Sequence, residues 1–402
     1  MRPICMVWAD GLRRRRQSIP GTPHPANPAP ESNSGLPQPT VLCGGYFALG
    51  RLRKPCCVLC GCSLPEDGIH PRYPTPVPRD HYVPQFYLSY FATVQQQGPA
   101  GFWVYDKDSG EPRFQTPINT TVERDLYSIP RPEGEPDRQI EAFLADLEGR
   151  TKPVLDRWQE PRARPDAEGM GVVGLILAMA HVRVPRQIRA AQEFDEATLL
   201  EETRLLLEDE QQMKALLESH RRDTGEDLGS LEDLREWLQM VGDRFRLRVN
   251  PKVALGSSLA QVDAITPYLR SLNWCLCRAS SDEPFVTSDS PVCMFAPMGG
   301  GQAVFGAGFA RPRVQITFPI SPSVCLLLDR QHSVGRMAVG SARTRELNWK
   351  TAWNAERFVI AAHKSSRVHA LVDECKVTRT LPKVDAAEVR QTYRQAKRDL
   401  AE

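Results

Sequence analysis

The sequence lacks the features that mark membrane-spanning and exported chains. It has no run of about 18 consecutive apolar residues, so we expect no membrane span. The arginines at 13–16 are followed by Gln17 and by prolines, whereas an export signal would continue with an apolar stretch. The formal net charge is only +2, so no global field draws the protein to an anionic membrane or to nucleic acid. We therefore expect a cytoplasmic protein, for which a nucleic-acid partner would require a local basic patch and no other partner is indicated.

The common catalytic and cofactor signatures are also missing. The sequence has no nucleophile elbow, zinc-protease helix, kinase signature or dinucleotide fingerprint. The glycine run at 299–301 lacks the lysine and serine of a phosphate loop, so we interpret it as coil. Cys57 and Cys60 have the spacing of half a zinc ribbon, but no second such pair exists, and Cys43, Cys62 or His70 would complete a site only irregularly. The sequence therefore names no cofactor.

Disulfide bonds are not expected. The chain has 11 cysteines, an odd number, and no export signal, which favours reduced thiols. Five of the cysteines lie in apolar, strand-like segments and are predicted to be small buried hydrophobes: Cys275, Cys277, Cys293, Cys325 and Cys375.

The composition changes near residue 80. Residues 1–79 are rich in proline, glycine and serine and are predicted to form a disordered tail, because they cannot bury enough apolar surface to offset chain entropy. An alternative is that the true start lies downstream and that this tail comes from a misassigned start. A single α+β domain is predicted over 80–380, followed by a charged C-terminal helix over 381–402.

Periodicity predicts a helical middle and a sheet built mainly from the last third of the chain. Apolar residues recur at helical spacing over 137–158, and the segment 171–191 is apolar around most of its circumference, which indicates a buried helix interrupted near Pro185. Further helices are predicted over 194–222, 231–241, 252–272 and 344–355. Strands are predicted over 102–106, 114–118, 273–278, 285–289, 314–318, 324–328 and 358–361.

Three groups of polar residues are candidates for a site. Glu141 and Glu148 lie seven residues apart and share a helix face, so they are either a carboxylate pair for metal or acid–base chemistry or part of the solvated face. Asp289 follows a strand and precedes a proline, where it could bind a cation, orient a base or cap a turn. His81 stands just before a helix start and could be a ligand, a base or a structural donor.

Several stretches together resemble a bacterial family of proteins of unknown function, DUF4238. The resemblance covers about 80–370 and is carried by the helix through Glu141 and Glu148 and by the segments 80–91, 104–107, 123–127, 183–185, 285–291, 319–322, 347–348 and 355–357. Ser290 departs from the asparagine that the family commonly has at this position. The resemblance implies no established activity, but it implies one constellation of site residues: His81, Glu148, Arg183, Asp289 and Asn348.

Two classes of function fit these residues. If the five side chains converge, a histidine, carboxylates and an arginine would suit hydrolysis of a phosphoester, with a divalent metal held by the carboxylates. The alternative is a binding or sensing module without catalysis, in which the histidine and the aspartate hold the framework together. The sequence does not decide between enzyme and binding module.

Overall fold

A computed structural model of the chain describes residues 79–376, apart from 95–97, 128–137, 209, 226, 228, 233–247, 281, 298–302, 306–307 and 310, together with residue 391. The predicted tail lies outside the described residues except for Arg79. So do most of the predicted helix at 231–241, most of the glycine-rich loop and, apart from residue 391, the predicted C-terminal helix. The chain forms two compact units, one from 71–191 and 254–382 and the other from 1–70, 192–253 and 383–402. The single domain over 80–380 stays a prediction.

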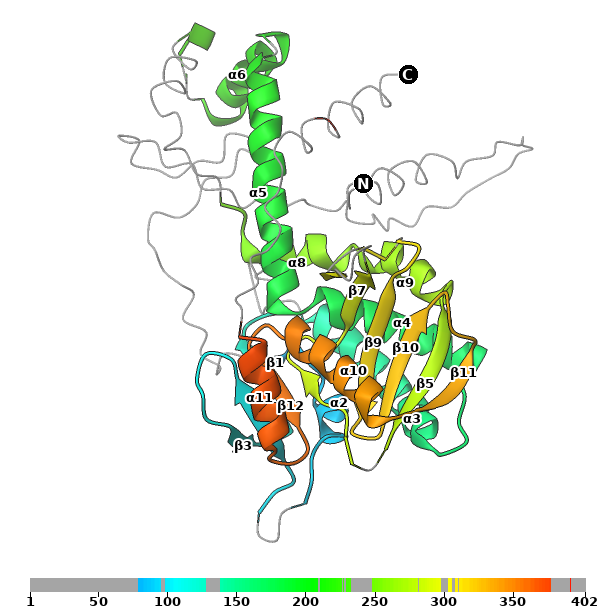
Figure 1. Ribbon diagram of the computed structural model, residues 1–402. Helices are drawn as coiled ribbons and strands as arrows, with labels where there is room; N and C mark the ends of the chain where they lie inside the picture. The colour runs from blue at the N-terminus through cyan, green and yellow to red at the C-terminus, as the bar shows by residue number, and fades with distance from the viewer. Residues whose placement is uncertain are drawn as a thin grey trace, which may run out of the picture. The chain divides into compact units, whose positions relative to one another are not determined.

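The larger unit contains a six-stranded sheet built from the last third of the chain. Its strands lie in the order β11 (Gly335–Val339), β5 (Asn273–Ala279), β10 (Val324–Asp329), β9 (Gln315–Ser321), β7 (Cys293–Pro297) and β8 (Ala303–Phe305). Neighbouring strands are antiparallel except β11 and β5, which are parallel. With helices in the middle of the chain and this sheet near its end, the predicted α+β class is confirmed (Figure 1).

Two smaller sheets complete the strands of this unit. A four-stranded sheet has the order β3 (Arg113–Gln115), β2 (Phe102–Asp106), β12 (Phe358–Ala361) and β6 (Thr287–Ser288). The hairpin of β2 and β3 matches the predicted pairing of these segments. A two-stranded sheet joins β1 (Arg79–His81) to β4 (Val122–Arg124). It fixes the segment at the start of the described chain.

Most helices follow the predicted periodicity, but α5 begins at Pro185 and not at 194, α11 was not predicted, and the segment 252–272 needs a correction. The helices are α2 (Gln85–Ser89), α3 (Gln139–Gln159), α4 (Ala167–Val182), α5 (Pro185–Glu208), α6 (Glu210–Thr224), α8 (Pro251–Leu259), α9 (Val262–Arg270), α10 (Ser341–Asn354) and α11 (Ser366–Glu374), with a 3-10 turn η1 (Pro117–Asn119). The single helix predicted over 252–272 is wrong. A turn at 260–261 divides this segment into α8 and α9.

Helix α4 is the buried helix that the sequence predicts. It begins at Asp166, whose side chain accepts a hydrogen bond from the N–H of Gly169, as is usual for an N-cap aspartate. Gly169 lies so close to α3 that an added Cβ would come within 2.7 Å of the Trp158 ring, so only glycine fits there. The helix ends at Arg183, two residues before Pro185, because proline disfavours helical backbone in the residue before it.

The six-stranded sheet has a different covering on each face. On one face, Leu276, Ile316 and Leu326 pack in the main core together with residues of α3, α4 and α9. On the other face, Cys277, Cys325 and Leu327 pack with Leu347 of α10. The four-stranded sheet packs against α10 and α11 in a third cluster of buried residues. Helix α10 therefore connects the two larger sheets.

The smaller unit includes α6 and the part of α5 that follows residue 191. Within it, Gln192 Nε2 donates to the carbonyl of Val249 at 2.8 Å, and the N–H of Val249 donates to Glu196 Oε1 at 3.0 Å. In the described part of the chain, no single helix has the length and apolar content to cross a membrane. One bent pair, α4 with residues 185–200, passes that test only when the two helices are taken together.

Candidate functional site

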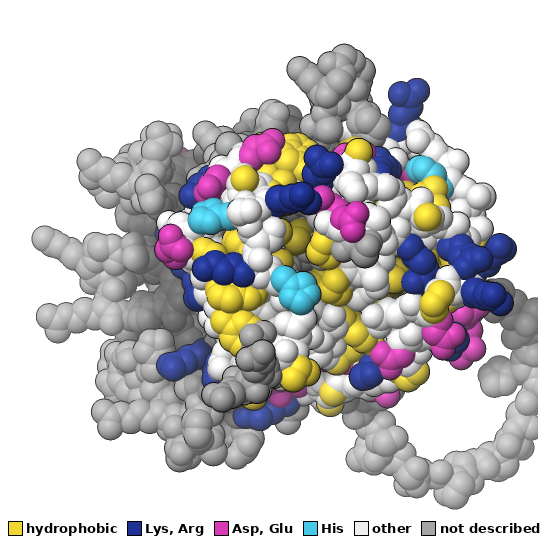
Figure 2. All heavy atoms as spheres, turned by 60° about the horizontal axis from the view of Figure 1, so that its bottom comes forward, with side chains coloured by type: hydrophobic (Ala, Val, Ile, Leu, Met, Phe, Trp, Pro, Cys, Tyr) yellow, Lys and Arg dark blue, Asp and Glu magenta, His cyan; other side chains and the backbone are white. Residues whose placement is uncertain are grey.

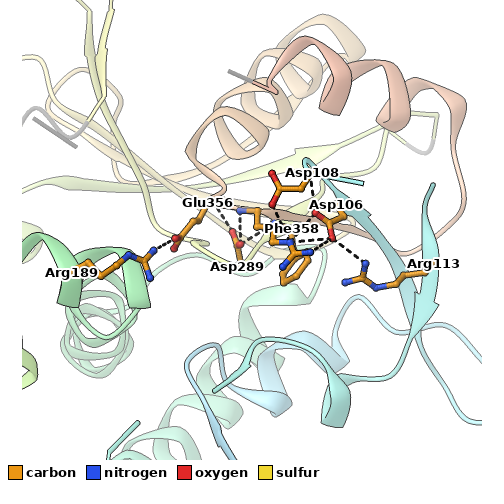
Figure 3. A network of polar contacts seen from close by, with 8 residues as sticks. Asp106, Asp108, Arg113, Arg189, Asp289, Glu356 and Phe358 are labelled. Carbon is orange, nitrogen blue, oxygen red and sulfur yellow. Dashed lines mark hydrogen bonds and ion pairs between the residues drawn. The ribbon is translucent and has the colours of Figure 1, made fainter. Parts of the chain in front are cut away.

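Asp289 holds the start of β12 through its carboxylate. The two oxygens accept backbone N–H groups from Glu356, Arg357 and Phe358 at 2.9, 2.7 and 2.8 Å. The N–H of Asp289 donates in turn to the carbonyl of Phe358 at 3.0 Å. We call this arrangement of residues 289 and 356–358 the Asp289 clasp (Figure 3). It joins the end of β6 to the connection between α10 and β12.

The charge of the clasp is not fully compensated. Burial raises the pKa of Asp289 to about 6, although the N–H groups of Phe358 and Arg357 and the charge of Lys107 favour the carboxylate. Glu356, whose N–H binds Asp289, forms an ion pair with Arg189 of α5 (Figure 3). The clasp therefore draws most of its stabilisation from hydrogen bonds to backbone, and its side-chain oxygens are already in use.

A second buried aspartate, Asp106 at the end of β2, extends this network. It accepts hydrogen bonds from Arg357 at 2.9 to 3.1 Å, from Arg113 at 3.1 Å and from the N–H of Asp108 at 3.0 Å. Burial acts to raise the pKa of Asp106, but these donors outweigh it and hold the pKa at about 2. Both guanidinium groups also lie over the Phe358 ring, that of Arg113 at 5.1 Å from the ring centroid and that of Arg357 at 4.9 Å.

Asn348 is likewise used by the backbone. From α10, its Oδ1 accepts the N–H of Val286 at 3.0 Å and its Nδ2 donates to the carbonyl of Pro284 at 2.9 Å. One helical side chain thus satisfies a donor and an acceptor of the segment that leads into β6. This pattern is that of a residue that positions backbone.

His81 uses both ring nitrogens for local contacts. Its Nε2 donates to the carbonyl of Ile118 at 3.2 Å, and Gln85 Nε2 donates to its Nδ1 at 3.1 Å. Burial lowers the pKa of His81, which favours the neutral ring that this hydrogen-bonding pattern requires. The histidine therefore ties β1 to η1 and to the first turn of α2.

Glu148 and Arg183 form a buried ion pair between α3 and the end of α4. Both terminal nitrogens of Arg183 donate to Glu148 Oε1 at 3.2 Å. The Arg183 side chain is fully buried, whereas 25% of the Glu148 side chain is exposed. Burial raises the pKa of Glu148, partly offset by the charge of Arg183. Arg183 Nε has no hydrogen-bond partner among the described residues.

Tyr127 interacts electrostatically with both members of this ion pair. Its backbone N–H donates to Asp80 Oδ2 at 3.0 Å, but its hydroxyl is buried without a hydrogen bond to any described residue. Burial raises the pKa of Tyr127, and the charges of four neighbours act on it: Arg183, Asp80, Glu148 and Glu123. We call Tyr127 and these four residues the Tyr127 cluster. Its charged side chains are one arginine and three carboxylates.

Asp80 also joins this cluster to Glu141. The pKa of Glu141 is raised to about 7, mainly by a hydrogen bond with Asp80 and secondly by burial. Two neighbouring carboxyl groups cannot both ionise without mutual repulsion, so one of them keeps a proton near neutral pH. Glu141 and Glu148 thus occupy the same helix face, as predicted, and each has a buried partner: Asp80 for Glu141 and Arg183 for Glu148.

The raised pKa of Glu141 predicts that stability depends on pH. Its contribution is fully present below the unfolded-state value, near 4.5, and is lost as the pH rises through about 7. Because Glu141 is partly exposed, solvent screening reduces this contribution to about 1 kcal/mol. Urea denaturation measures how much the free energy of unfolding falls between about pH 5 and about pH 8. This fall should be smaller in Glu141→Gln than in the wild type by about 1 kcal/mol. An identical loss in both proteins would contradict the shared proton.

The five predicted site residues make contacts of different kinds. Glu148 and Arg183 are in direct contact. Asp289 and Asn348 instead bind backbone, and His81 binds Ile118 and Gln85. Tyr82 interacts electrostatically with both the Asp289 clasp and the Tyr127 cluster. Burial raises its pKa, and the charges of Asp289 and Glu123 both act on it. Glu123 also belongs to the Tyr127 cluster.

The residues that sequence reasoning missed are Asp80, Tyr82, Glu123 and Tyr127, all of which except Tyr82 belong to the Tyr127 cluster, and the buried anchors Asp106 and Asn354. Asn354 Nδ2 donates to the carbonyls of Ser290 and Val292 at 2.8 and 3.1 Å. A weak indication did exist, because the segments 80–91 and 123–127 carry the resemblance described above and together contain the first four of these residues.

The fold and its polar centres define the class of this protein: an α+β fold that contains a carboxylate clasp and a cluster of ionisable residues around the buried Tyr127. The family model described as "Protein of unknown function (DUF4238)" matches residues 79–365. The chain belongs to this family. No curated protein matches it, and no solved structure does.

Proposed function

We propose that the protein is a binding module whose ligand carries an amine or another cationic group and is held at the Tyr127 cluster. The observation that carries this proposal is the buried hydroxyl of Tyr127, which has no partner among the described residues. A buried polar group without a hydrogen bond costs about 1 to 3 kcal/mol, so a fold that retains one gains from a partner that supplies the missing bond.

The charges of the cluster favour a cationic ligand. Asp80, Glu123 and Glu148 act on Tyr127 together with only one cation, Arg183. A negatively charged ligand would meet repulsion there, whereas an ammonium group could donate to carboxylates and to the phenol oxygen. Glu123 is exposed and Glu148 is partly exposed, so these two carboxylates reach solvent, while Asp80, Tyr127 and Arg183 are buried.

In this proposal the other predicted site residues are framework. The oxygens of Asp289 and the amide of Asn348 are bound to backbone, and both ring nitrogens of His81 are bound as well. A ligand would have to break those contacts to use them. Nucleic acid is a poor candidate partner, since basic and acidic side chains are interspersed on the face seen in Figure 2 and the net charge is close to zero.

A calorimetric titration with spermidine as the probe tests the proposal. We expect wild-type protein to bind spermidine and Glu148→Gln to bind it at least about fivefold more weakly, because one carboxylate charge is lost. Glutamine keeps an oxygen that can accept from Arg183, so the fold should persist. The matched control is Asp146→Asn, an exposed carboxylate on the same helix, which should bind like the wild type. If spermidine does not bind, or if both variants weaken binding equally, the proposal is wrong.

A second candidate is hydrolysis of a phosphoester, with the carboxylates of this cluster binding a divalent cation. The feature that favours it is Glu141, whose pKa is raised to about 7 by the hydrogen bond with Asp80 and by burial, in the range that suits a general acid at neutral pH. Among the described residues, no group of three or more His, Cys, Asp or Glu side chains has an arrangement that could hold a metal ion. Hydrolysis of bis(4-nitrophenyl) phosphate in the presence of Mn²⁺, lost in Glu141→Gln, would favour this candidate over a binding module.

A further inference from the structure

Strand β11 is an edge strand of the six-stranded sheet and is longer than the other edge strands of the described residues. It has five residues and pairs with β5 on one side only, as the outermost strand beyond β5 in Figure 1. The other edge strands, β1, β3, β4, β6 and β8, have two or three residues each, and short length is one way in which proteins protect a sheet edge. Strand β11 lacks this protection.

The other devices that protect sheet edges are also missing from β11. The strand contains no proline or lysine, and its register with β5 runs without a bulge. Its one charged side chain, that of Arg336, binds its own chain, where Nη1 donates to the carbonyl of Pro161 at 2.6 Å. Ala338 is exposed, and the side chain of Val334, just before the strand, is 49% exposed. The edge therefore offers small and apolar side chains to a partner strand.

The register of β5 shows which backbone groups of β11 point away from the sheet. On the β10 side, the N–H of Ala279 donates to the carbonyl of Ser323 at 3.0 Å. Because successive strand residues direct their backbone groups to opposite sides, the even-numbered residues of β5, such as Leu276, bond to β11. In a parallel pair the residue opposite a bonded one directs its own N–H and C=O away, so those of Arg336 and Ala338 point outward. No strand of the described residues pairs with them there.

We propose that β11 is a dimer interface, at which the strand pairs antiparallel with β11 of a second copy of this chain. The two-fold axis passes through Met337, so that Arg336 of each copy lies opposite Ala338 of the other. These are the residues whose backbone groups point outward, and two such residues opposite each other in an antiparallel pair exchange both N–H···O=C bonds. The interface is the same patch on both copies, so the assembly closes at two.

The charge and the length of β11 select this register and favour a copy of the strand as its occupant. A register centred on Arg336 would set two arginines directly opposite each other, and like charges destabilise a strand pair. A register centred on Ala338 would carry Arg336 to Gly340, where the strand has ended and α10 follows. Centred on Met337, the strand sets its only charge against an exposed alanine and pairs its outward backbone groups within its own length.

Sedimentation equilibrium of the full-length protein, at concentrations up to about 100 µM, tests the interface and its register. We expect the wild type to form dimers. Ala338→Lys places a second positive charge opposite Arg336 in both symmetric pairs and should raise the dimer Kd at least about tenfold. The matched control is Ala338→Glu, which puts a long charged side chain at the same exposed position but with the sign that attracts Arg336. It should leave the Kd within about threefold of the wild type or lower it.

A second substitution shows whether the effect comes from the pairing of these two residues. Adding Arg336→Glu to Ala338→Lys restores opposite charges across the interface and should bring the Kd back to within about threefold of the wild type. A wild type that stays monomeric or forms open assemblies, an equal effect of Ala338→Lys and Ala338→Glu, or no recovery in the double variant would each overturn the proposal. The test does not involve the Tyr127 cluster, so its outcome and that of the spermidine titration are independent.

Discussion

Replacing Asp289 by alanine is expected to lower the free energy of unfolding by about 3 to 4 kcal/mol. The substitution removes the acceptor of three backbone N–H groups at 2.7 to 2.9 Å and leaves those donors without partners beside a buried position. It also releases the connection between β6 and β12, whose pairing involves only two residue pairs. Urea denaturation at neutral pH measures the loss.

Asp108→Ala is the matched control for this prediction. Asp108 belongs to the same network, but 76% of its side chain is exposed and it contacts Arg357 at 3.4 Å. Exposed ion pairs contribute little, so its loss should change stability by less than about 0.5 kcal/mol. If Asp289→Ala cost no more than this control, the aspartate would not be framework and a direct role in chemistry would have to be reconsidered.

The elements that the sequence predicted well are those with buried, periodic apolar residues. Strand β5 and helices α3 and α4 follow their patterns because burial is what produces the pattern. Strand β9 extends beyond its predicted end and passes through Pro319, where proline was expected to mark a connection. Opposite Pro319, the pairing of β10 with β9 is irregular between Val324 and Cys325. This irregularity accommodates proline, which has no backbone N–H to donate.

The elements that were missed have little pattern to detect. Strands β1 and β4 are three residues each and contain exposed polar side chains, so neither alternation nor an apolar run marks them. Strand β11 exposes Arg336 and Ala338 at the edge of the sheet. The turn between α8 and α9 occurs at Ala260 and Gln261 without a glycine or proline, and only tertiary packing can determine where such a helix ends.

The candidate site was predictable only in some of its residues and not in their roles. Asp289 could be singled out from its place between a strand and a proline, yet the groups it binds lie 67 to 69 residues away in the chain. No local pattern reports such a contact. The pairing of Glu148 with Arg183 spans 35 residues and two helices, and the unpartnered hydroxyl of Tyr127 is visible only once the surrounding side chains are in place.

Tyr127→Phe is the substitution that separates ligand binding from stability most sharply. The change removes only a hydroxyl that has no hydrogen bond among the described residues. Removing an unsatisfied buried group should leave stability unchanged or raise it by up to about 1 kcal/mol. If that hydroxyl serves a ligand, the same change should weaken binding of the spermidine probe at least about tenfold, which corresponds to about 1.4 kcal/mol.

The most direct test is therefore thermal denaturation of wild-type and Tyr127→Phe protein, each with and without spermidine. The proposal predicts that the two proteins melt at similar temperatures alone, or that the variant melts slightly higher, and that spermidine raises the melting temperature of the wild type much more than that of the variant. A variant that melts several degrees lower alone would show that the fold itself uses the hydroxyl. An equal shift by spermidine in both proteins would show that the ligand binds elsewhere, and either result would contradict the proposed site.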